Sequence, residues 1–178
     1  KSARTSAEAA GKLAQRLSLP YAFQAEDLSL SFAYTQTITV ASQAIERPDP
    51  PAFAYRLRGG AYYWMYDLAN AQADLDKALA LDPNDIEAAA LLALLSAETN
   101  QADDLKALAE RASLQAAKTA AGLMVQAVAA SYNYDYRTAR TLLDEAIVLA
   151  PERPELYILR SETFTSSVDE AAWFADLD

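Results

Sequence analysis

The chain has 178 residues, of which 52% are hydrophobic and 22% charged, and a net charge of −10. This length and composition fit one domain or a short array of repeats and exclude a disordered chain. The absence of His and Cys excludes His-based catalytic triads, Cys nucleophiles, Cys/His zinc sites and disulfides. With only four glycines and no glycine-rich phosphate motif, we also expect no bound cofactor.

The acidic balance, with a pI near 4.5, argues against certain partners. Such a surface repels phosphate backbones, so nucleic-acid binding is not expected. The longest apolar runs fall far short of the ~20 residues that a membrane span needs. We therefore expect a soluble chain with no membrane insertion, and its start at Lys1 suggests a processed product or an excerpt.

Residues 1–51 form a divergent first segment. A capping box at Thr5–Glu8 predicts a helix over Ala9–Leu17 that Pro20 ends. Apolar and polar residues then alternate over Leu28–Val40, which is typical of a strand, although no second alternating segment exists to pair with it. A divergent helical hairpin over Tyr21–Ile45 is the favoured alternative, and a Pro-rich linker follows it.

An internal repeat governs the rest of the chain. The pattern Ala-x3-Leu-x2-Ala-x4-Pro begins at Ala71 and again at Ala139, 68 residues (twice 34) later. The segment Tyr55–Arg58 also matches Tyr157–Arg160 at an offset of 102, three times 34. One period explains both matches, so the chain is predicted to be an array of 34-residue units.

This period, together with Tyr55, Gly59, Tyr62, Ala71 and Pro83 at their spacings, resembles the tetratricopeptide repeat (TPR) family. The resemblance implies an all-α fold, a right-handed superhelix of antiparallel helix hairpins. The units it implies are residues 52–85, 86–119, 120–153 and a partial unit 154–178. Because Asp178 would fall inside a second helix, we expect the parent protein to continue beyond it.

The resemblance also implies a binding surface. The first helices, expected over Ala52–Met65, Ile86–Thr99 and Ala120–Asn133, would line a concave groove. Aromatic and Arg side chains are concentrated on recognition surfaces. The partner-binding groove is therefore expected to contain Arg56, Tyr63, Trp64, Leu94, Met124, Val128 and Tyr132.

One groove residue has a second interpretation, because Trp64 could equally pack between hairpins. Outside the groove set, Arg58 and Arg160 share one repeat position and are expected to form structural salt bridges rather than ligand contacts. The carboxylate clamp of one TPR subclass is not matched, because Gly60 and Leu91 stand at its Asn positions. We expect no catalytic residue and no metal site, since the acidic pairs along the chain lie on neighbouring helix positions that face different ways.

The predicted function is a protein–protein interaction or scaffold module that binds a partner peptide or helix, and not an enzyme. One alternative is a self-associating repeat, because open-ended arrays leave apolar terminal faces that a second copy can cover. The other is the recruiting arm of a larger enzyme whose catalytic part lies outside this chain.

Overall fold

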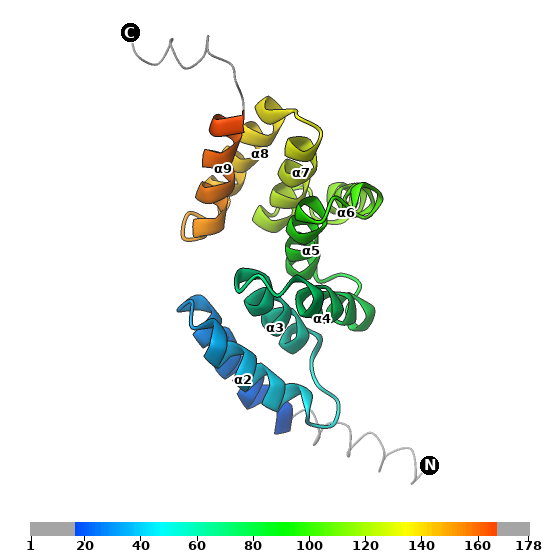
Figure 1. Cartoon of the computed structure of the whole chain (residues 1–178), viewed down its shortest axis with the longest axis vertical. Coiled ribbons are helices and arrows are strands. Elements are labelled where there is room, and N and C mark those ends of the chain that lie inside the picture. The colour runs from blue at the N-terminus through cyan, green and yellow to red at the C-terminus, as the bar shows by residue number, and fades with distance from the viewer. Residues whose placement is uncertain (1–16, 167–178) are drawn as a thin grey trace. The chain divides into compact units, whose positions relative to one another are not determined.

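The computed structural model describes residues 17–166, and every regular element within that range is an α-helix (Figure 1). This confirms the predicted all-α class of helical hairpins. Residues 17–30 are helical, and the helices that follow are α2 (Tyr34–Ile45), α3 (Ala52–Trp64), α4 (Leu68–Leu81), α5 (Ile86–Glu98), α6 (Ala102–Gln115), α7 (Ala120–Tyr132), α8 (Tyr136–Leu149) and α9 (Pro154–Ser166).

The helices follow the 34-residue period closely. The first helices of successive hairpins start at residues 52, 86, 120 and 154, and the second helices at residues 34, 68, 102 and 136. Each of the three predicted first helices ends one residue earlier than expected. Because α2 starts 34 residues before α4, the period reaches back into the segment that we set apart as divergent.

The N-terminal segment is a helical hairpin, not a strand. The alternating residues between Leu28 and Val40 belong to the helix of residues 17–30, a short turn, and α2. The prediction that Pro20 ends a helix is wrong, because Pro20 lies within the helix of residues 17–30. Proline fixes φ at a value that a helix accepts. The predicted helix over Ala9–Leu17, except for Leu17 itself, and the expected end of the last hairpin lie outside the described residues.

The chain divides into two compact units, one ending at Leu95 and the other starting at Ser96, so the division falls inside α5. In the first unit α3 packs against both α2 and α4. In the second, α7 packs against α6 and α8, and α9 packs against α8 and more lightly against α7. Within each unit, packed helices are thus neighbours or near neighbours in sequence, which is the packing of a repeat array.

Small residues bring paired helices close together. Ala71, Leu75 and Ala78 of α4 are completely buried. A methyl group added to Gly59 of α3 would lie 3.0 Å from Cγ of Leu75, so the glycine permits this approach. In the second unit Ala139, Leu143 and Ala146 of α8 are buried at the same repeat positions. The two motifs that revealed the period therefore form equivalent helix seams.

Every hairpin turn has the same unusual backbone. The residue that follows the first helix by one or two positions has a positive φ, between 56° and 63°, at Phe32, Tyr66, Asn100 and Tyr134, which are spaced 34 residues apart. The next amide donates to the carbonyl five residues earlier, as Asp67 does to Tyr62 at 2.9 Å. This is the Schellman helix ending, which normally places Gly or Asn in the left-handed position. Here three of the four residues are aromatic.

The second helices begin at carboxylate caps in two of the hairpins. The side chain of Asp67 accepts from the backbone N–H of Asn70, and that of Asp135 accepts from the N–H of Thr138. The first helix α5 is capped in the same way, since Asp85 accepts from the N–H of Ala88 at 3.0 Å. The caps satisfy amides that have no partner within the helix.

Candidate functional site

Arg56, the only cation among the predicted groove residues, is already paired. Its Nε lies 3.0 Å from Oδ2 of Asp85, and both side chains are mostly buried. The same carboxylate caps α5, so Arg56 links the middle of α3 to the start of the next hairpin. A partner group that binds Arg56 would have to compete with Asp85 for it.

The two aromatic residues at the end of α3 differ sharply in exposure. Tyr63 is 9% exposed, whereas Trp64 is 41% exposed. Their rings meet edge to face with centroids 5.1 Å apart. Tyr63 is thus the packing residue of the pair, and Trp64 offers a face to solvent.

Three apolar members of the predicted groove are buried. Leu94 of α5, in the first unit, is 5% exposed, and Met124 and Val128 of α7, in the second, are 1% and 6% exposed. In this conformation they shape the helix packing and offer little surface to a partner. Within the predicted set Trp64 is exposed, and Tyr132 and Arg56 are partly exposed.

Tyr132, at the end of α7, belongs to a hollow of about 480 Å³ in the second unit. The hollow lies among α6, α7 and α8, and its apolar lining includes Leu105, Ala109, Ala129 and Leu142. The Tyr132 hydroxyl donates to Oδ1 of Asn100, the left-handed residue of the preceding turn. This bond orients the ring and ties α7 to the turn between α5 and α6.

The hollow originates in an exchange of large and small residues. At repeat positions 20 and 24, α4 has Ala71 and Leu75, and α8 has Ala139 and Leu143. In α6 the order is reversed to Leu105 and Ala109. Leu105 is buried, while Ala109 is left partly exposed on the wall of the hollow. The Leu side chain that fills the seam in α4 and α8 is therefore displaced by one helical turn in α6.

The hollow combines this apolar lining with polar side chains. Asp103, Lys106 and Glu110 of α6 and Gln126 of α7 also line it. An apolar floor with a few polar groups is the usual composition of a recognition site. The hollow was not predicted from the sequence, and the signal that could have revealed it is the Leu105/Ala109 exchange.

The prediction of structural salt bridges at Arg58 and Arg160 agrees with the geometry. Arg58 binds Asp74 through two bonds, from Nε at 2.7 Å and from Nη2 at 2.8 Å. The hydrogen bonding that Arg58 donates to Asp74 is the main reason that the pKa of Arg58 is raised, against the opposing effect of burial. Arg160 binds Asp144 at 2.8 Å in a much more exposed pair.

Among the described residues, no group of three or more acidic side chains is arranged to hold a metal ion. None of their helices combines the length and the apolar character that crossing a bilayer requires.

These features define a protein built from TPR-like helical hairpins. Among solved structures, the chain is similar to "MamA MSR-1 C2", with a TM-score of 0.52 and 15% identity over 83% of this chain and 85% of that one. It also matches YrrB, described as a TPR protein with an unusual peptide-binding site, at 19% identity over 81% of this chain and 92% of that one, with a TM-score of 0.34. No family model and no curated protein matches the sequence.

Proposed function

We propose that this chain is a protein–protein interaction module that binds a peptide or a helix of a partner protein. The TPR-like fold supports a scaffold role in general. The observation that carries the finer proposal is the hollow among α6, α7 and α8, which has an apolar lining and contains Tyr132. Trp64 is the corresponding exposed aromatic residue of the first unit.

The hollow suits an apolar anchor of a partner. A side chain that enters it would bury surface against Ala109, Ala129 and the ring of Tyr132. Lys106 and Glu110 are placed to pair with charges beside that anchor. Because the helices already hold these groups in place, little conformational entropy would be lost on binding.

The decisive variant is Ala109→Leu, because it fills the hollow with the residue that α4 and α8 have at this position. The matched control is Ala107→Leu, which makes the same change at an exposed position of α6 outside the hollow. Partners captured from the source cells by the whole chain are compared by quantitative mass spectrometry. We expect Ala109→Leu to lose a partner that Ala107→Leu retains, with both variants folded.

A second pair of variants tests Tyr132 itself. Tyr132→Ala removes the ring from the hollow, whereas Tyr132→Phe removes only the hydroxyl that binds Asn100. Truncation of a true aromatic anchor costs about 2 kcal/mol or more of binding free energy. If Ala109→Leu and Tyr132→Ala both bind the captured partner with unchanged affinity, the hollow is not the binding site.

A further inference from the structure

A second surface of the first unit exposes large apolar side chains. Leu30, Phe32, Met65 and Tyr66 are 76%, 59%, 50% and 75% exposed, and we call these four residues the turn edge. They stand at the ends of two successive first helices, immediately before the second helices begin. None of them lines the hollow of the second unit.

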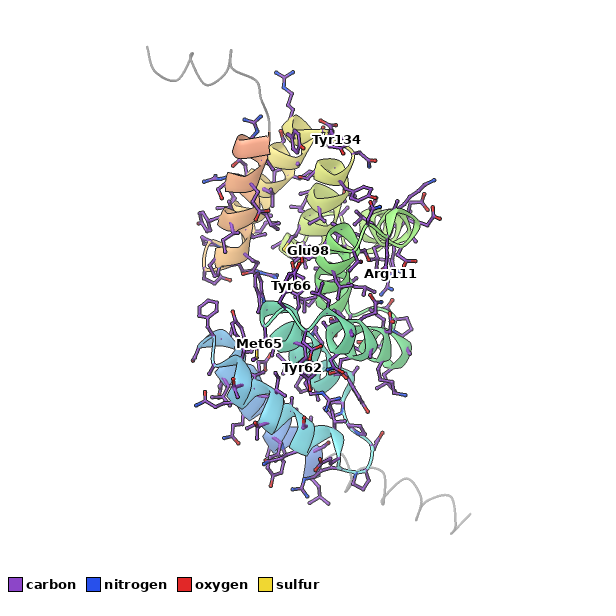
Figure 2. All side chains as sticks on the ribbon, in the orientation of Figure 1. Tyr62, Met65, Tyr66, Glu98, Arg111 and Tyr134 are labelled. Carbon is purple, nitrogen blue, oxygen red and sulfur yellow. The ribbon has the colours of Figure 1, made fainter. Side chains whose placement is uncertain are left out.

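The packing of the first unit brings the two turns to the same side. The ring of Phe23 packs against that of Phe53 with centroids 5.7 Å apart, and Ala25 belongs to the same core cluster as Leu57. The helix of residues 17–30 and α3 therefore run in the same direction, and continuing this register brings Phe32 level with the end of α3. Figure 2 shows Met65 and Tyr66 on the side of the first unit where the turn between residues 30 and 34 also lies.

The aromatic residues of the turn edge occupy a strained backbone. Phe32 and Tyr66 have φ values of 56° and 62°, a region that disfavours bulky side chains. Asn100 fills the same position of the next hairpin, so this chain does use the residue that the conformation prefers. Two adjacent turns thus have exposed aromatic rings at positions where the backbone conformation favours Asn, which points to a role in recognition.

The charged residues that flank the turn edge along the chain are acidic. Asp27 is exposed one turn before Phe32, and Asp67 directly follows Tyr66. No Lys or Arg occurs between residues 17 and 46 or between residues 59 and 76. Aromatic faces beside carboxylates attract Lys and Arg side chains. A second copy of this chain would instead bring the same acidic edge against itself.

We infer that the turn edge binds a basic, apolar segment of a partner protein, in which Lys or Arg stands beside Leu, Phe or Trp. The apolar side chains would cover Leu30 and Met65, and the cations would lie on the rings of Phe32 and Tyr66 near Asp27 and Asp67. This surface goes beyond the function proposed above, because it uses neither the hollow nor Tyr132.

The test uses a displayed library of random 12-residue peptides, selected on the whole chain. The selected peptides are measured against the double variant Phe32→Asn/Tyr66→Asn, which removes both rings but keeps residues that accept a positive φ. Leu114→Gln is the control, because it removes an apolar side chain that is 87% exposed in the second unit. Asp27→Lys, at an exposed position, is a second variant that reverses one charge and leaves both rings in place.

We expect a class of peptides rich in Lys or Arg beside Leu, Phe or Trp. These should bind the double variant at least tenfold more weakly, bind Asp27→Lys several-fold more weakly, and bind Leu114→Gln unchanged. The inference is overturned if no peptide distinguishes the double variant or Asp27→Lys from the native chain, or if the distinguishing peptides are neutral or acidic. It is also overturned if the native chain is a dimer that the double variant dissociates. Peptides sensitive to Ala109→Leu alone would support the hollow and count against the turn edge.

Discussion

Arg58 and Arg160 occupy the same repeat position, and each contacts the residue 16 positions before it in the preceding hairpin. Arg58 donates to Oγ of Ser42 at 3.0 Å, and Arg160 donates to Oδ1 of Asp144 at 2.8 Å. Arg58 additionally binds Asp74 in its own hairpin. An Arg at this repeat position thus joins successive hairpins by polar contacts.

The two arginines should contribute very differently to stability. Asp74 is 9% exposed in its ion pair, whereas Asp144 is 61% exposed. Asp74→Ala leaves the partly buried Arg58 without its main partner, so we expect a loss of about 2 kcal/mol in the free energy of unfolding. Asp144→Ala should cost less than about 1 kcal/mol. Urea denaturation checks both values, and equal losses would contradict this ranking.

The strained turns predict a stabilising substitution. Tyr66→Asn places a residue that tolerates φ near 62° where the bulky side chain is disfavoured. We expect the free energy of unfolding to rise by about 1 kcal/mol. The matched control is Tyr66→Ala, which removes the ring but keeps the steric penalty of a Cβ atom. Thermal unfolding should show a gain for Asn and none for Ala, and equal midpoints would mean that the turn is not strained.

Substitution by Ala should destabilise the chain at one glycine and have little effect at another. A Cβ atom at Gly122 would clash with the backbone carbonyl oxygen of Ala116, which moves aside less readily than a flexible side chain. At Gly60 it would meet only the flexible end of Leu91, at 3.1 Å. We expect Gly122→Ala to cost about 3 kcal/mol and Gly60→Ala to stay within about 1 kcal/mol of the native chain. Chemical denaturation of the two variants decides between these outcomes.

The adjacent aromatic residues Tyr63 and Trp64 of α3 should contribute differently to stability. Because Tyr63 is 9% exposed, Tyr63→Ala should cost about 3 kcal/mol of stability. Trp64→Ala should cost about half as much, because part of its side chain already faces water. Trp64→Ala is therefore the cleaner probe of partner binding. A folded, fully stable Tyr63→Ala variant would show that the Tyr63 ring does not support the core.

The cap of α8 predicts a pH dependence. Hydrogen bonds from the side chain and the backbone N–H of Thr138 lower the pKa of Asp135 below its ordinary value. A lowered pKa in the folded state means that the stabilisation is present above the ordinary Asp pKa and is lost as the pH falls through the folded value. In Asp135→Asn, which keeps a capping oxygen without the charge, thermal stability should fall less on acidification. Parallel pH profiles of the melting temperature would contradict this.

Glu162 should act in the opposite sense. Partial loss of solvent around Glu162, which is still exposed, and then repulsion from Glu98 raise its pKa above the ordinary value. The folded chain therefore gains stability relative to the unfolded chain as the pH falls, and loses it as the pH rises through the pKa that Glu162 has in the folded state. We expect Glu162→Gln to be more stable than the native chain at neutral pH, with the difference shrinking as the pH is lowered.

Much of the fold could be predicted because the period is carried by few residues with a steric role. Ala71, Leu75 and Ala78 are small or seam-filling at fixed spacing, and Pro83 follows the end of α4. Once this frame was known, the starts of α3, α5 and α7 followed from it. The prediction that Pro20 ends a helix was wrong because a proline ends a helix only at some positions, and the repeat frame does not show which position Pro20 has in its helix.

The candidate site was harder to predict, because exposure depends on packing that the repeat pattern does not specify. The repeat frame placed Tyr63 and Trp64 together in a groove, but neighbouring helix positions differ by about 100° in direction, and only one of the two remains on the surface. The hollow depends on Leu105 and Ala109 jointly, so neither residue reveals it alone. The aromatic residues at positive φ went unnoticed because Gly or Asn is the usual signal there.

The locality of the helix contacts has a kinetic consequence. The packed pairs described above join helices that are adjacent or next but one along the chain. Few long loops must close before such contacts form, so each unit should fold rapidly for its size. Repeat arrays of this kind also lose structure piecewise. Under a pulling force applied at its two ends, the chain should therefore lengthen in hairpin-sized steps rather than in one cooperative rupture.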